Sequence, residues 1–240
     1  MNRDRVPELA GSSSTDLDGV FRRARRASRA FVAVGVFLAS ASAAAAAGID
    51  HARAALEAEG KREFDAAIEL YTKAIEAGDL SKENLADVHA YRGNARFFLG
   101  RFTEAASDYE ASLTVNPKAI YPAFWLYIAR ARSGQDGRAE LTKNSARLKD
   151  LFYWPGPIAA LFLGKATPKA VVAGAEDPFL DARRQREQLC EAHFYVGQYH
   201  LLNGRTAEAA AAFKKALATG AKDFVEHSAA KVELERLGQP

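Results

Sequence analysis

The chain has 240 residues, of which 48% are hydrophobic, so it can bury a substantial core and is not a disordered tail. Its formal charge of +3 comes from residues 1–47, which hold seven arginines against four acidic residues, and the remainder is balanced. A balanced body lacks the basic face that nucleic-acid binding requires, so we expect no nucleic-acid partner.

The first segment is typical of an export signal. Five arginines between Arg22 and Arg29 precede an apolar run over residues 30–38, and small residues follow over 39–48. Ala45-Ala46-Ala47 ahead of Gly48 also supplies the small side chains that a signal peptidase needs. We therefore expect residues 1–47 to be a signal peptide with a long polar and basic lead-in, and the protein to be periplasmic or exported.

Alternatives remain open for this segment. Residues 30–49 are all apolar or small and just long enough to cross a bilayer, so an uncleaved inner-membrane anchor facing the periplasm is one of them. A cytoplasmic protein with an alanine-rich arm is another. Residues 2–19 are polar and lack apolar periodicity, so translation could also begin near Val20.

The body of the chain repeats itself. Small and aromatic residues recur at the same offsets in two ungapped segments, first as Gly93, Gly100, Ala105, Tyr109, Ser112 and Pro117, then as Gly197, Gly204, Ala209, Phe213, Ala216 and Ala221. Small residues let paired helices cross closely, and the aromatic residue faces the next pair. With an earlier copy around Ala55 and Tyr71, and a degenerate copy in which Lys143 replaces the aromatic residue, the pattern predicts repeats over 48–85, 86–119, 120–151 and 190–223.

Residues 152–189 break this period. Pro168 and Pro178 are expected to start two short helices within an irregular insertion. The last element, residues 224–238, has an apolar face that fades at Arg236, as suits a capping helix whose outer side meets water. We predict one all-α domain over residues 48–240, a right-handed α-solenoid of helix hairpins with an inserted helical pair.

These spacings resemble the 34-residue tetratricopeptide repeat. Over residues 49–239 the order of parts also resembles bacterial cell-envelope proteins of the new lipoprotein I type. The stretches that carry the resemblance are Tyr91-Arg92-Gly93-Asn94-Ala95, Phe124-Trp125-Leu126-Tyr127, His193-Phe194-Tyr195-Val196-Gly197 and Asp223-Phe224-Val225-Glu226-His227. The namesake is a lipoprotein, whereas this chain has alanine and glycine where a lipidated cysteine would stand, so lipid anchoring is not expected.

The resemblance implies a periplasmic, homodimeric scaffold that holds cell-wall hydrolases and delivers substrates to a processing protease. A structural assembly factor of an envelope complex is the alternative. In this fold the first helix of each repeat lines a concave groove, and aromatic and aliphatic anchors there would suit a peptide segment, although some of them could be core. The groove positions are Asp87, Asn94, Phe97, Phe98, Tyr121, Phe124, Ile128, Arg132, Glu191, Phe194, Gln198, Leu201 and Leu202.

The sequence gives little support to catalysis. Cys190, the only cysteine, excludes an intrachain disulfide, and its place in a repeat helix favours a buried small hydrophobe. Cys190 and His193 are one helical turn apart, so a thiol-dependent enzyme is the less favoured alternative. His193 and His200 are two turns apart and cannot share one ion. We expect no enzyme activity, no cofactor and no metal.

Overall fold

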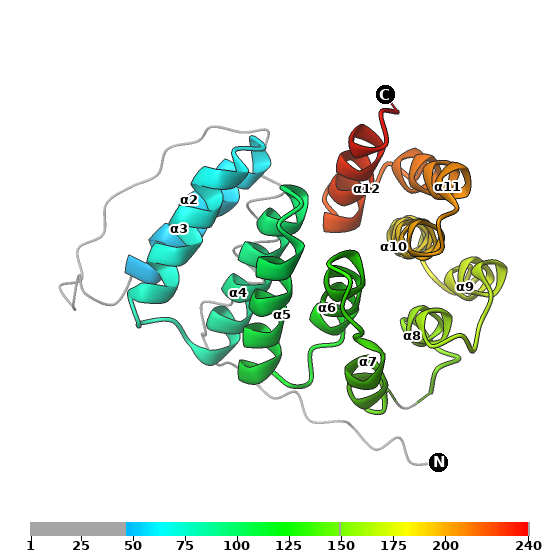
Figure 1. Cartoon of the computed structure of the whole chain (residues 1–240), viewed down its shortest axis with the longest axis horizontal. Helices are drawn as coiled ribbons and strands as arrows, with labels where there is room; N and C mark the ends of the chain where they lie inside the picture. The colour runs from blue at the N-terminus through cyan, green and yellow to red at the C-terminus, as the bar shows by residue number, and fades with distance from the viewer. Residues whose placement is uncertain (1–46, 149, 240) are drawn as a thin grey trace, which may run out of the picture.

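The computed structural model describes residues 47–148 and 150–239, and in these residues helices are joined by turns and loops. Each helix packs against the one before it and the one after it, so the described chain is a helical solenoid of the predicted all-α class (Figure 1). The first three pairs are α2 (Ala47–Gly60) with α3 (Phe64–Glu76), α4 (Lys82–Phe98) with α5 (Phe102–Val115), and α6 (Tyr121–Arg132) with α7 (Arg138–Ser145).

The second part of the array contains the irregular insertion. Its helices are α8 (Gly156–Phe162), α9 (Pro168–Ala175), α10 (Ala182–Leu202), α11 (Thr206–Ala218) and α12 (Val225–Arg236). Pro168 starts α9 as expected, but the prediction that Pro178 starts a helix is wrong. α10 begins at Ala182, because the side chain of Asp181 accepts hydrogen bonds from the backbone amides of the first turn.

The predicted export signal lies outside the described residues, apart from Ala47. The questions of cleavage, anchoring and translation start therefore stay predictions. Among the residues that are described, no helix combines the length and the hydrophobicity that crossing a membrane requires.

The crossing of paired helices depends on glycine. A Cβ added at Gly93 in α4 would lie 2.9 Å from Cε1 of Tyr109, and one added at Gly197 in α10 would lie 2.4 Å from Cε1 of Phe213. Both rings are fully buried, so each lies directly against the backbone of the partner helix. The small residues therefore allow the close crossing that the sequence predicts. The aromatic rings, which were expected to face the next pair, lie instead against the glycine of their own pair, and Tyr109 also stacks on Trp125 of the next pair at 6.1 Å.

The buried apolar side chains form two clusters. The smaller cluster joins α2, α3 and α4 and consists mainly of alanines, with Ile68 and Tyr71 as its larger members. The larger cluster extends from the end of α4 to α12 and is built on aromatic contacts, with Trp125 between Phe97 and Phe194 at centroid distances of 5.0 and 5.1 Å. The first helix pair thus has a core largely separate from that of the rest.

The turns inside the helix pairs share one backbone geometry. Gly100, Gly134 and Gly204 have φ of +78°, +80° and +70°, the left-handed conformation that ends many helices. Arg62 takes the same place in the first pair, with φ of 64°. A side chain in this region costs roughly 1–2 kcal/mol, because Cβ crowds the following carbonyl oxygen. The first turn is therefore strained where the others are relaxed.

We expect Gly197→Ala to lower the free energy of unfolding by roughly 1–3 kcal/mol, because the buried Phe213 ring has no room to move away from the new methyl group. Gly93→Ala should have a smaller effect. Gly60→Ala is the matched control, since an added Cβ there meets nothing within 4 Å, and it should be stabilising. Urea unfolding of the three variants measures their free energies of unfolding. Equal values for Gly197→Ala and Gly60→Ala would contradict the close contact between Phe213 and the backbone at Gly197.

Candidate functional site

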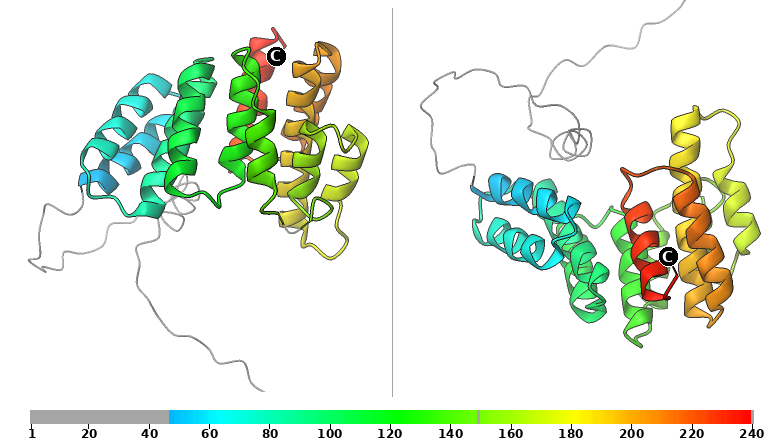
Figure 2. Two further views of the ribbon diagram at one scale, coloured as in Figure 1. Left: turned by 60° about the horizontal axis from the view of Figure 1, so that its bottom comes forward. Right: turned by 90° about the horizontal axis from the view of Figure 1, so that it is seen from above.

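The concave side of the solenoid is formed by α4, α6 and α10, and α12 curls back toward it (Figures 1 and 2). α12 packs against α10 and α11 and also reaches α4. Most of the predicted groove residues are consequently buried, namely Asn94, Phe97, Phe98, Phe124, Ile128, Glu191, Phe194 and Gln198. The remaining ones are partly buried, namely Asp87, Tyr121, Arg132, Leu201 and Leu202. The buried members are therefore unavailable to a partner in this conformation, whereas the five partly buried ones keep some exposed surface.

The direct contact between α6 and α10 explains this difference. The Tyr121 hydroxyl donates to Oε2 of Glu191 at 2.9 Å, and the rings of Phe124 and Tyr195 lie 5.7 Å apart. The short insertion α8–α9 packs beside this contact and does not separate α6 from α10. The first helices of successive pairs therefore follow a strongly curved path. Along this path the next helix, α12, lies close enough to contact α4.

Asn94 is used inside its own helix pair. The buried hydroxyl of Tyr109 donates to Oδ1 of Asn94 at 2.8 Å. This bond fixes the ring that packs over Gly93, so Asn94 positions the helix crossing and is not presented to a partner.

Ion pairs join α12 to earlier helices. Arg62 donates to both carboxylate oxygens of Glu235, at 2.9 and 2.5 Å. Arg132 lies 3.1 Å from the carboxylate of Glu233, and Arg236 lies 2.5 Å from the same carboxylate. The Glu233 side chain is 1% exposed, so two guanidinium groups neutralise its buried charge. Removing either arginine would leave that charge poorly compensated and would lower the free energy of unfolding.

Arg236 also caps α4. Its Nη2 donates to the carbonyl oxygens of Phe97 and Phe98 at 3.0 and 2.9 Å, at the helix end where the dipole favours a cation. Its guanidinium lies 5.4 Å from the ring centroid of Phe102, and that of Arg132 lies 4.4 Å from it. The charged side of α12 therefore contacts α4 and α6 near its end, while Ser228 and Lys231 of the same helix are exposed, as expected for a last helix whose outer side meets water.

Two buried glutamates lie where α12 meets α10. Glu191 accepts from Tyr121 and, at 2.8 Å, from the indole nitrogen of Trp154, whereas Glu226 accepts from the Tyr195 hydroxyl at 3.1 Å. Burial, reinforced by the charge of Glu226, raises the pKa of Glu191 to about 8. Burial and the nearby Glu226 therefore both favour the protonated form of Glu191, which avoids placing two negative charges in one buried layer.

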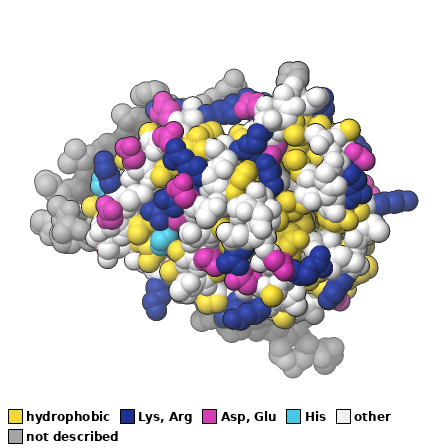
Figure 3. Space-filling model, in the orientation of Figure 1, with side chains coloured by type: hydrophobic (Ala, Val, Ile, Leu, Met, Phe, Trp, Pro, Cys, Tyr) yellow, Lys and Arg dark blue, Asp and Glu magenta, His cyan; other side chains and the backbone are white. Residues whose placement is uncertain are grey.

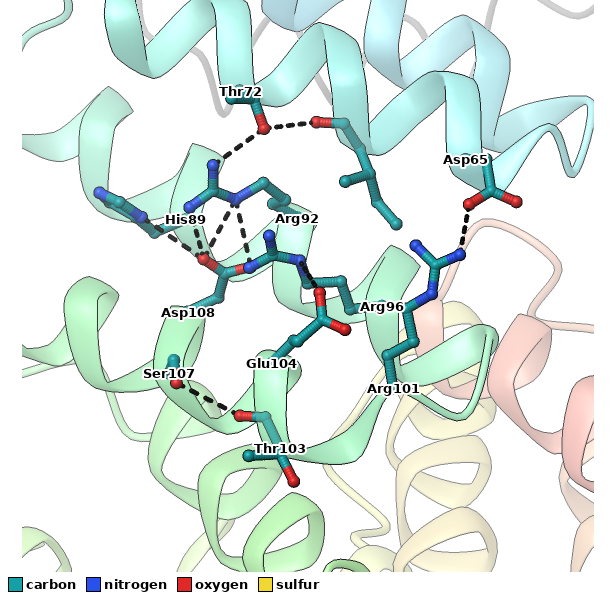
Figure 4. A network of polar contacts seen from close by, with 11 residues as sticks. Asp65, Thr72, His89, Arg92, Arg96, Arg101, Thr103, Glu104, Ser107 and Asp108 are labelled. Carbon is teal, nitrogen blue, oxygen red and sulfur yellow. Dashed lines mark hydrogen bonds and ion pairs between the residues drawn. The ribbon is translucent and has the colours of Figure 1, made fainter.

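A polar network separates the two cores (Figure 4). Asp108 of α5 pairs with Arg92 and Arg96 of α4 at 2.7 Å each, and Nδ1 of His89 lies 3.8 Å away. Arg92 also donates to Thr72 of α3 at 3.0 Å. Burial acts to raise the pKa of Asp108, but hydrogen bonds and the nearby cations hold it below its usual value. The network ties three helices together and leaves Asp108 no free carboxylate edge for a ligand.

Cys190 does not have the environment of a nucleophile. The residue is fully buried, and burial raises the pKa of its thiol to about 12, so the reactive thiolate is disfavoured. Burial lowers the pKa of His193. Across residues 47–148 and 150–239, no group of three or more histidine, cysteine or acidic side chains is placed to hold a metal ion.

Large exposed aromatic side chains occur around the insertion. Phe152 and Tyr153 are 77% and 71% exposed, and Phe179 is 95% exposed. The rings of Phe152 and Tyr153 meet edge to face at 5.6 Å. The repeat pattern does not point to these aromatic residues, and their position outside the repeat register is the sequence feature that sets them apart. Charges of both signs are interspersed on the face seen in Figure 3, and no large single-sign patch is visible on that face.

Comparison with known proteins gives limited information. No family model matches the chain. Among solved structures, the crystal structure of MamA protein has 16% sequence identity and a TM-score of 0.38, covering 72% of this chain and 92% of that chain. The helical solenoid is shown by the sequential packing of the helices themselves.

The contribution of Glu191 to the free energy of unfolding should fall as the pH rises from about 5 to 8. The folded-state pKa of Glu191 is raised to about 8 from an ordinary value of 4.5, so the folded protein binds more protons than the unfolded chain in this window. Glu191→Gln should remove much of this pH dependence and have its most favourable effect at pH 8, on the order of a few kcal/mol. Urea unfolding at pH 5 and 8 measures it, with the exposed Glu208→Gln as control. An unchanged pH slope in Glu191→Gln would refute the protonated state.

Proposed function

We propose that the protein is a non-catalytic protein-binding scaffold of the cell envelope. The observation that carries this proposal is the exposure of Phe152, Tyr153 and Phe179 on an otherwise well-packed array. Large aromatic side chains are unfavourable in water, and they supply much of the energy at protein interfaces, so we expect a partner protein to cover them. The stacked helix pairs supply the rigid frame on which such side chains are held.

The resemblance to proteins of the new lipoprotein I type supports a narrower proposal. On that basis the partners are a periplasmic processing protease and the cell-wall hydrolases presented to it, and a second copy of the chain is a further candidate. A structural role in assembling an envelope complex is the second proposed function. It draws on the same aromatic residues but predicts partners that are neither proteases nor hydrolases.

Removing the exposed aromatic pair should abolish partner recovery and leave the fold intact. Phe152→Ser with Tyr153→Ser changes two side chains that are more than 70% exposed, so thermal unfolding should be nearly unchanged. Affinity purification of the full-length chain from cross-linked envelopes, followed by mass spectrometry, should recover a protease or wall hydrolase that the double variant loses.

Lys169→Ser is the matched control, because it changes an exposed residue of the same insertion without touching an aromatic ring. Equal recovery with all three chains would remove the aromatic residues from the proposed interface. Consistent recovery of structural envelope components alone would favour the assembly role over delivery to a protease.

Export can be tested separately from partner binding. Residues 1–47 fused to a reporter enzyme that is active only in the periplasm should give activity, because the arginine cluster and apolar run have the order of a signal peptide. A fusion of residues 48–240 to the same reporter is the control and should be inactive. Activity from neither fusion would contradict the envelope location.

A further inference from the structure

Arg62 stands where the repeat uses glycine. The matching turn positions in the other pairs are Gly100, Gly134 and Gly204, and all share the left-handed backbone conformation. Glycine adopts that conformation readily because it has no Cβ. The side chain of Arg62 therefore makes this turn less favourable than the matching turns of the other pairs. Such a residue is expected where its side chain makes an interaction that glycine cannot make.

The interaction is a bidentate ion pair with the last helix. Arg62 lies at the tip of the α2–α3 pair, and its two terminal nitrogens reach separate oxygens of Glu235, which is 173 residues away in the chain. Two parallel hydrogen bonds of this kind fix the relative orientation of the two side chains more closely than a single ionic contact does. The contact therefore links the first turn of the array to the helix that ends it.

The α2–α3 pair has limited apolar contact to hold it in place by itself. Its apolar contact with α4 is made mainly by small side chains, including Val88 and Ala95 of α4. The polar network and two ring contacts add to it, Phe64 with Phe98 at 5.2 Å and Tyr71 with Tyr91 at 6.2 Å. A change in the angle of this pair would separate Phe64 from Phe98. Phe98 is one of the groove residues that the sequence predicts and that this conformation buries.

We propose that Arg62 and Glu235 form a clasp that joins the two ends of the solenoid and keeps its concave side closed, so that the α2–α3 pair swings away from α12 when the ion pair is broken. The clasp concerns the shape of the chain itself. It does not depend on the identity of a partner or on the function proposed above.

The test measures the distance between the first pair and α12 in the full-length protein. Spin labels on cysteines introduced at the exposed positions Glu69 and Lys231 report that distance by double electron–electron resonance. Cys190 stays unlabelled because it is fully buried. Glu235→Gln should add a longer-distance component, and about 1 M NaCl should do the same to the native pair, whose two side chains are 44% exposed.

Two substitutions at Arg62 separate the clasp from the strained turn. Arg62→Gly and Arg62→Ala both remove the guanidinium, so both should lengthen the distance equally. Only glycine relaxes the left-handed turn, so the Tm of Arg62→Gly should exceed that of Arg62→Ala by roughly 2–4 °C. The charge exchange Arg62→Glu with Glu235→Arg should restore the native distance distribution.

Glu76→Lys is the control for a charge change on the same helix pair, because it lies at the far end of α3 from Phe64. It should leave the distance unchanged. Native distances in Glu235→Gln and Arg62→Ala would overturn the proposal, because α12 would then be held without the ion pair. Failure of the charge exchange to restore the distance would also overturn it.

Discussion

The aromatic rings that lie on glycine backbones set the spacing of two helix pairs, α4 with α5 and α10 with α11. Tyr109 over Gly93 and Phe213 over Gly197 bring two helices closer than any residue with a Cβ would allow. Each pair formed in this way presents a similar face to the next one, so the pairs stack and their first helices follow one curve. The hydrogen bond from Tyr109 to Asn94 then fixes the ring at this crossing.

α12 contacts two parts of the array, the preceding helices α10 and α11 and the earlier helices α4 and α6. Its apolar side, with Ala229, Ala230 and Leu234 buried, packs on the adjacent helices, as a cap should. Its charged side carries Glu233 and Arg236, which bond to side chains and carbonyl oxygens of α6 and α4. The apolar stripe therefore fades at Arg236 because this side chain bonds to the end of α4 while it remains partly in contact with water.

The helix pairs could be predicted from the sequence because each crossing depends on a glycine and an aromatic residue that lie close together in the chain. The closed concave side could not, since it depends on the curve set by the insertion and on pairs far apart in the chain, such as Arg62 with Glu235. No periodicity encodes such a pair. One local sign was present, because Arg62 occupies a position held by glycine at Gly100 and Gly204. An exception in a repeat can thus indicate a long-range contact.

The polar network at the junction of α3, α4 and α5 decides how the first pair can move. Arg92 with Thr72, and Arg101 with Asp65, fix the direction of the α2–α3 pair through hydrogen bonds, whereas the large aromatic core begins only beyond them. Directional polar contacts give a defined orientation with less apolar burial than a continuous core would provide. A change of angle at this junction would therefore leave the aromatic core around Trp125 intact. If breaking the ion pair between Arg62 and Glu235 opens the concave side as proposed, these polar contacts are the ones that must change.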